Sequence, residues 1–197
     1  MSAELHRAID NHDLDTLARL LAAGHDPDEL GEGWAPLHNA MGDLEAVALL
    51  LRHGANPNVW DRDRYVTPLL TALFGGYRDA ALMLLAAGAD PNVKNCVGDF
   101  PLLMCAERGD LKMAATLLRA GATKTMEESG GCGAGMKALG YAAFRLDIEM
   151  IRLLLAWGAS ITMQDVDRRL PLDLLPERTA ENAEKYDLAL ELLSPKP

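Results

Sequence analysis

The residues best suited to chemistry stand in one short stretch, SGGCGAGMK, at positions 129–137. Gly130 and Gly135 have the separation of a phosphate-binding loop, G-x-x-x-x-G-K-[ST], whose backbone N–H groups cradle phosphate. The lysine comes one place late, at 137, and the preceding segment LKMAATLLRAGA has helical spacing where such a loop needs a β-strand. Nucleotide binding through the loop Gly130–Lys137 is therefore an alternative hypothesis and not our first.

The other titratable and nucleophilic residues form no arrangement typical of catalysis or metal binding. None of the histidines pairs with Cys or Glu at ligand spacing, and the three cysteines contain no C-x-x-C motif. No acidic pair stands in an apolar pocket suited to general acid–base catalysis, and Ser129 lacks the preceding G-x of a nucleophile elbow. We expect no catalytic residue, no metal and no cofactor, hence no enzyme, and we expect reduced thiols in a cytoplasmic protein.

Composition and charge narrow the class further. Of the 197 residues, 49% are hydrophobic but only 5% aromatic, so leucine and alanine carry the apolar content and favour helices. There is no apolar run of about 18 residues, which predicts no membrane span. Residues 1–45 hold ten acids and two bases, a net charge of −8 out of −10 for the chain. This excess argues against nucleic-acid binding and is compatible with a basic protein partner.

The elements that must position these residues repeat with a period near 33. Leucine-rich runs end in glycine at positions 24, 54, 88, 121 and 158, so the spacings are 30, 34, 33 and 37. A second register appears in APLH, TPLL, FPLL, KALG and LPLD. A proline suits the first turn of a short helix, and a turn then leads to a second helix that ends at the glycine. The pattern predicts stacked helix pairs.

Three segments carry a resemblance to a known family: APLHNA (35–40), GDLEAVALLLRHGANPN (42–58) and TPLLTA (67–72). They resemble the ankyrin repeat, whose pattern is T-P-L-H-x-A-A, then G-x-L-E, then V-x-L-L-L-x-x-G-A-D-P-N. The resemblance implies an all-α ankyrin-repeat solenoid of about six helix-turn-helix units, the first and last as caps, with short hairpin-like tips. We expect one domain over 1–197, with units near 1–30, 31–61, 62–95, 96–130, 131–164 and 165–197.

Two departures from the regular pattern bear on function. From Leu37 to Gly54 is 17 residues where the equivalent distance elsewhere is 19, so the second unit has lost two residues at the end of its first helix. The glycine-rich stretch is an insertion between the fourth and fifth units, which we expect to form a flexible turn tip. Met126, Cys132 and Met136 in or beside it are soft side chains that we expect to adapt to a partner.

The resemblance implies a protein-interaction module that binds a folded partner on its concave side, made of the first helices and the tips. An alternative is an immunity or inhibitor protein that neutralises a basic, nuclease-like bacterial toxin, and a further one is an adaptor that links two proteins. The oligomeric state stays open. Aromatic and arginine side chains dominate binding hot spots, and the candidate partner-binding residues are Trp34, Arg62, Arg64, Tyr65, Phe74, Glu107, Arg108, Phe144, Arg145 and Arg168.

Overall fold

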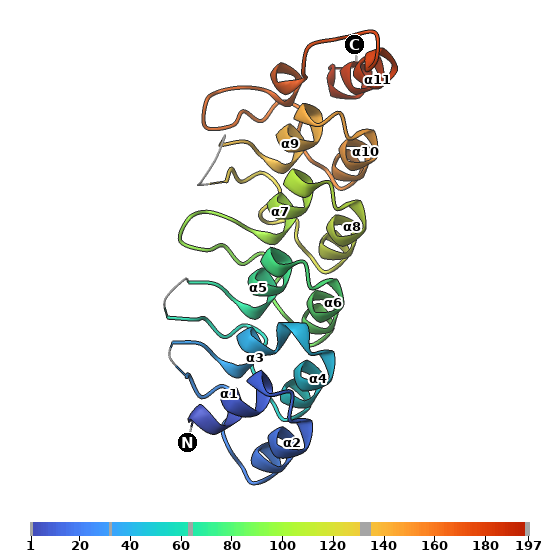
Figure 1. Ribbon diagram of the computed structural model, residues 1–197. Coiled ribbons are helices and arrows are strands. Elements are labelled where there is room, and N and C mark those ends of the chain that lie inside the picture. The colour runs from blue at the N-terminus through green and yellow to red at the C-terminus, as the bar shows by residue number, and fades with distance from the viewer. Residues whose placement is uncertain (1, 32, 63–64, 131–134, 196–197) are drawn as a thin grey trace. The chain divides into compact units, whose positions relative to one another are not determined.

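The computed structural model describes residues 2–31, 33–62, 65–130 and 135–195, which fall into two compact bodies, Met1–Cys96 and Val97–Pro197 (Figure 1). The first body contains α1 (Ser2–Asp10), α2 (Leu14–Ala22), α3 (Pro36–Asn39), the 3-10 turn η1 (Ala40–Gly42), α4 (Leu44–Arg52), α5 (Pro68–Gly75) and α6 (Arg78–Ala86). The second body contains α7 (Pro101–Arg108), α8 (Leu111–Arg119), α9 (Ala138–Phe144), α10 (Ile148–Ala156), the 3-10 turn η2 (Pro171–Leu174) and α11 (Ala183–Leu193). The regular elements of these described ranges are helices, which confirms the all-α prediction.

Each body consists of two layers of helices. In the first body α1, α3 and α5 pack side by side in one layer, and α2, α4 and α6 form the other (Figure 1). In the second body α7, α9 and η2 form one layer, and α8, α10 and α11 the other. We call these the first-helix layer and the second-helix layer. Within each body the long turn tips project beside the first-helix layer, so helix ends and tips share one face (Figure 1).

Local chemistry explains where the second helices begin. Helices α2, α4, α8 and α10 each start after an aspartate whose carboxylate accepts a hydrogen bond from a backbone N–H of the first turn. Asp110, for example, accepts from the N–H of Met113 at 3.0 Å, and Asp147 accepts from that of Met150 at 3.1 Å. Such a cap satisfies one of the N–H groups that a helix start leaves without a partner. The aspartate before each apolar run therefore fixes the register of the pair.

Left-handed residues end the first helices and turn the chain back. Gly76 after α5 and Gly109 after α7 have φ angles of 73° and 75°, which glycine adopts without steric strain. At the equivalent places in the first and fifth repeats stand His12 and Leu146, with φ angles of 52° and 50°. A side chain in this region strains the backbone, so neighbouring contacts must hold these two turns.

The core is formed by leucines at repeated positions. In the first-helix layer Leu5, Leu37, Leu69 and Leu102 have no exposed surface, and Leu139 keeps 3%. In the second-helix layer the fully buried leucines are Leu17, Leu50, Leu84, Leu117 and Leu154. Burying one such side chain stabilises the fold by about 1.5–3 kcal/mol, so the pairs hold together mainly by stacking on their neighbours.

Side chains also link each turn to the next by hydrogen bonds. Asp28 accepts from the N–H of Asn56 at 2.9 Å, and Asn58 accepts from that of Asp90 at 2.7 Å. In the second body Glu127 accepts from the N–H of Ser160 at 2.7 Å. These bonds join positions 28, 32 and 33 residues apart, so each one links a turn to the corresponding turn of the next repeat.

The second repeat is shorter than its neighbours, as the spacing predicted. Helix α3 ends at Asn39 after four residues and continues as η1, whereas α5 and α7 have eight residues each. When the second and third repeats are aligned on Leu37 and Leu69, the second repeat lacks the positions of Phe74 and Gly75 in α5. The end of the first-helix layer is therefore two residues short at this place.

Candidate protein-binding surface

In the first body, the candidate residues lie at the end of α5 and on the turn tips. Phe74 lies at the end of α5 with 44% of its surface exposed, and Tyr65 on the tip that precedes α5 is 57% exposed with φ 52°. Arg62 is also exposed. Arg64 lies outside the residues that the structure describes. Exposure on one face is what a contact residue needs, and their role in binding stays a prediction.

Trp34 is held by its own tip and by a buried histidine. Its N–H and C=O exchange two hydrogen bonds with Gly31, at 3.0 and 2.8 Å, and its ring meets that of His38 edge-on with centroids 5.6 Å apart. The Nε2 atom of His38 lies 3.2 Å from the carbonyl oxygen of Val66. Burial lowers the pKa of His38, so the ring is neutral near pH 7 and joins two successive repeats. Trp34 is accordingly half-buried and fixed in orientation.

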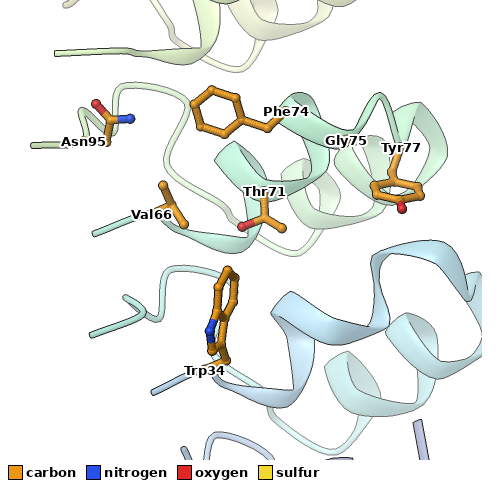
Figure 2. Close-up of a pocket in the computed structure, with 7 residues that line it drawn as sticks. All are labelled: Trp34, Val66, Thr71, Phe74, Gly75, Tyr77 and Asn95. Carbon is orange, nitrogen blue, oxygen red and sulfur yellow. The ribbon is translucent and has the colours of Figure 1, made fainter. Parts of the chain in front are cut away.

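Trp34 and Phe74, far apart in the sequence, line one hollow of about 590 Å³ (Figure 2). Its other lining residues are Val66, Thr71, Gly75, Tyr77 and Asn95. In Figure 2, Thr71 lies between Trp34 on one side and Phe74 on the other, and Tyr77 lies beyond Gly75. This volume is within the usual range of about 300–1,000 Å³ for ligand sites in proteins.

Sequence reasoning missed most of this lining. The sequence predicted Trp34 and Phe74 as contacts on one surface but did not indicate Val66, Thr71, Tyr77 or Asn95. The available signal was the two-residue deletion in the second repeat, which removes the counterparts of Phe74 and Gly75. A Cβ added at Gly42 would lie 3.8 Å from the ring of Tyr77, so this ring lies beside the end of the shortened helix.

In the second body, the candidates lie at the ends of α7 and α9 and on the last tip. Phe144 occupies the place in α9 that Phe74 has in α5 and is 55% exposed. Arg145 follows it, and a Cβ added at Gly109 would lie 3.1 Å from its Nη2 atom. The guanidinium therefore rests on the turn that ends α7. Glu107 and Arg108 at the end of that helix are exposed, as is Arg168, whose φ is 61°.

The inserted glycine-rich tip is packed at both described ends. A Cβ added at Gly130 would lie 2.5 Å from a methyl of Leu103, and one added at Gly135 would lie 1.9 Å from Cγ2 of Val166. The expected flexible centre, residues 131–134, lies outside the described residues, and Cys132 with it. The expectation that Met126 and Met136 adapt to a partner is wrong, because each is only 6% exposed and packs in the core.

Lys137, the lysine of the apparent phosphate motif, is buried and makes its contacts within the fold. It is 8% exposed, its Nζ donates to the backbone oxygen of Glu127, and it lies 3.8 Å from Oε2 of the same residue. Glu127 in turn accepts from the N–H of Ser160. A nucleotide phosphate would have to displace these contacts, so the geometry gives the nucleotide hypothesis no support.

The described ranges contain no group of three or more His, Cys, Asp or Glu side chains that could hold a metal ion. Over the same ranges, no helix is both long and apolar enough to cross a membrane.

Comparisons with known proteins agree with this architecture. A family model described as ankyrin repeats (3 copies) matches residues 5–95 and 87–165. Cyclin-dependent kinase 4 inhibitor B of Bos taurus is 34% identical over 117 residues, which are 58% of this chain and 89% of that protein. An ankyrin repeat protein of Rickettsia felis is 32% identical over 126 residues, but the match spans only 41% of its length.

Solved structures show the same fold. The ankyrin repeat domain of Acinetobacter baumannii AYE is 27% identical with a TM-score of 0.80, over 96% of this chain and 95% of that one. One chain in the structure of a predatory endopeptidase from Bdellovibrio bacteriovorus in complex with an immunity protein is 24% identical, has a TM-score of 0.72 and covers 96% of both chains. At that identity the likeness shows the fold alone. The family match spans most of the sequence, and the chain belongs to the ankyrin repeat family.

Proposed function

We propose that this protein is a non-enzymatic binding module whose six repeats act as one domain and hold a folded protein partner. Ankyrin repeats generally mediate protein–protein interaction, and the partner would lie on the face shared by the first helices and the turn tips. The observation that carries the proposal is the pair of exposed phenylalanines, Phe74 and Phe144, which are 44% and 55% exposed at equivalent helix ends. Large aromatic side chains gain more from burial at an interface than from contact with water.

The second candidate function, an inhibitor or immunity protein against a basic toxin, is favoured by the acidic beginning of the chain. Its net charge of −8 over residues 1–45 includes exposed carboxylates on α1 and α2, such as Glu4, Asp10 and Asp15. Such a surface speeds association with a basic protein and makes it depend on salt. The name of one relative, cyclin-dependent kinase 4 inhibitor B, indicates that a short array of this family inhibits an enzyme.

We propose a cytoplasmic location, which the free thiols of Cys96 and Cys105 support. The nucleotide hypothesis has a direct test, since calorimetric titration with ATP and magnesium would reveal any affinity. We expect no heat of binding, because Lys137 is engaged by Glu127.

The binding proposal is tested by affinity purification with the full chain, followed by quantitative mass spectrometry. The wild type is compared with the double variant Phe74→Ala/Phe144→Ala, whose two positions are exposed and whose fold should survive. A partner enriched by the wild type and depleted by the double variant supports the proposal. If the double variant captures the same partner as strongly as the wild type does, the proposal is contradicted. An isolated partner whose affinity falls steeply between low and high salt supports the inhibitor candidate, and a flat salt dependence contradicts it.

A further inference from the structure

A histidine of the first repeat reaches the helix cap of the second. The Nδ1 atom of His12 lies 3.2 Å from Oδ2 of Asp43. The other carboxylate oxygen of Asp43, Oδ1, accepts hydrogen bonds from the N–H groups of Glu45 and Ala46 at 3.1 and 3.0 Å, and so caps α4. One carboxylate therefore starts the second helix of its own repeat and receives a ring from the repeat before it.

His12 occupies a backbone position that glycine fills in the third and fourth repeats. Its φ angle is 52°, whereas Gly76 and Gly109 turn the chain there without strain. Leu146, at the same place in the fifth repeat, is only 8% exposed, so burial offsets its strained backbone. The side chain of His12 is 73% exposed and gains no such burial. Its contact with Asp43 takes the place of that burial.

A similar arrangement in the second body contains a permanent cation. A Cβ added at Gly109 would lie 3.5 Å from Oδ2 of Asp147, the capping aspartate of the next repeat, and 3.1 Å from Nη2 of Arg145. A guanidinium stays protonated in proteins, whereas an imidazole gains and loses its proton between about pH 5 and 8. The place beside the capping aspartate thus holds a fixed charge in the second body and a titratable ring in the first.

The charged groups of the elements packed around His12 are mainly carboxylates. Asp10 ends α1, Asp15 lies on the first turn of α2 and Glu45 on the first turn of α4, and all three are exposed. A protonated ring therefore meets negative charge on each of these helices. The other charged or titratable groups of the packed elements are Arg7 and Arg19, which line a separate hollow with Glu4 and Asp13, the buried His6 and His38, and Arg52 on the last turn of α4.

The aspartate keeps its charge while the ring titrates. Hydrogen bonding by the N–H of Ala46 lowers the pKa of Asp43, so this carboxylate is ionised throughout the range in which an imidazole titrates. Its side chain is only 15% exposed, which limits screening by water. A hydrogen bond between two charged groups is roughly twice as strong as one between neutral groups. The contact is therefore strongest when the ring is protonated.

We propose that His12 and Asp43 form a pH-sensitive contact between the first and second repeats, which holds the first repeat more tightly in mild acid than at alkaline pH. In a solenoid each repeat contacts only its neighbours, so the contacts between two repeats decide how readily one of them opens. The stabilisation is present below the pH at which the ring loses its proton and is lost as the pH rises through that value.

The test is amide hydrogen exchange of the full chain at about pH 5.5 and about pH 8, with the wild type and His12→Asn compared at each pH. Asparagine tolerates a left-handed backbone and offers an N–H near the place of Nδ1, but it does not titrate. The readout is the ratio of the α2 exchange rates, variant over wild type, with α5 as internal reference. We expect this ratio to be about two- to fivefold larger at the lower pH.

Two further variants control for the contact. His53→Asn, at an exposed histidine that follows α4, should show the same ratio at both pH values. Asp43→Asn removes the charge of the acceptor and keeps an oxygen for the N–H of Ala46. In that background His12→Asn should have the same effect at both pH values, because the ion pair is already lost. If His12→Asn is unfolded by circular dichroism, His12→Gly takes its place, since glycine adopts the left-handed φ freely.

Three results would each overturn the proposal. A ratio for His12→Asn that is equal at the two pH values, or larger at the higher one, contradicts it. A pH-dependent ratio that persists in the Asp43→Asn background would refute Asp43 as the partner of His12. The same pH dependence in His53→Asn would show a general effect of losing a histidine, which also refutes the contact. The proposed protein-binding function does not depend on any of these outcomes.

Discussion

Replacing Lys137 by methionine removes the ammonium that anchors the inserted tip and keeps most of the side-chain stem. A hydrogen bond from a charged donor to a carbonyl, such as the one to Glu127, contributes about 1.5–3 kcal/mol. The ion pair with the Glu127 carboxylate at 3.8 Å adds at most about 1 kcal/mol, because a third of that side chain is exposed. We therefore expect Lys137→Met to lower the free energy of unfolding by about 1.5–4 kcal/mol.

The assay is urea unfolding of the full chain followed by far-UV circular dichroism. Lys112→Met, an exposed lysine on α8 of the same body, is the matched control and should change stability by less than about 0.5 kcal/mol. Glu127→Gln removes the carboxylate charge but keeps an oxygen for the N–H of Ser160, so it should lose only the ion-pair part. If Lys137→Met unfolds within about 0.5 kcal/mol of the Lys112→Met control, the lysine does not anchor the tip and our reasoning is refuted.

Three further predictions follow from backbone strain, sterics and titration. Gly135→Ala should lower the free energy of unfolding by about 1–3 kcal/mol, because φ is 61° and the new methyl would lie 1.9 Å from Val166. Adding Val166→Ala should recover the steric part of this loss. If the losses of the two single variants simply add in the double variant, the contact is contradicted. Arg168→Gly should raise the free energy of unfolding by about 0.5 kcal/mol, because glycine adopts the left-handed φ of 61° without strain. A lower free energy of unfolding would instead show that the arginine side chain stabilises the tip. The pKa of Asp43 is lowered chiefly by the N–H of Ala46, so its contribution is present above about pH 4 and is lost as the pH falls through the lowered value. Asp43→Asn should flatten this part of the pH dependence of urea midpoints between about pH 5 and 3, and an unchanged slope would count against the cap.

The helix pairs could be predicted from the sequence because their signals are local. Prolines, capping aspartates and terminal glycines mark the ends of most helices within a few residues, and leucines such as Leu69 and Leu102 are buried by their place in the repeat. The short α3 followed from counting residues between Leu37 and Gly54. Predicting these features does not require knowing which residues are their neighbours in space.

The site depended on contacts between elements, and there the sequence was insufficient. The deletion indicated where a gap should be, but not that Tyr77 would turn toward it or that Trp34 and Phe74 would share its walls. The spacing around Lys137 suggested a phosphate loop, whereas its burial beside Glu127 involves residues ten positions apart across the insertion. Side-chain burial of this kind is decided by tertiary packing, which a motif does not encode.

Three hydrogen bonds from a backbone N–H of one turn to a side-chain oxygen of the turn before it run the same way along the chain. In each case the acceptor side chain belongs to the earlier turn and the donating N–H to the later one, from Asp28 to Asn56, from Asn58 to Asp90 and from Glu127 to Ser160. The array therefore has a polarity at its ends. Removing an early turn strips a backbone N–H in the next turn of its acceptor, whereas removing a later turn leaves side-chain groups, such as the Asn58 amide that donates to Gly88, which can turn toward water. Shortening the protein from its N-terminus should thus unravel the adjoining repeat more readily than shortening it from its C-terminus.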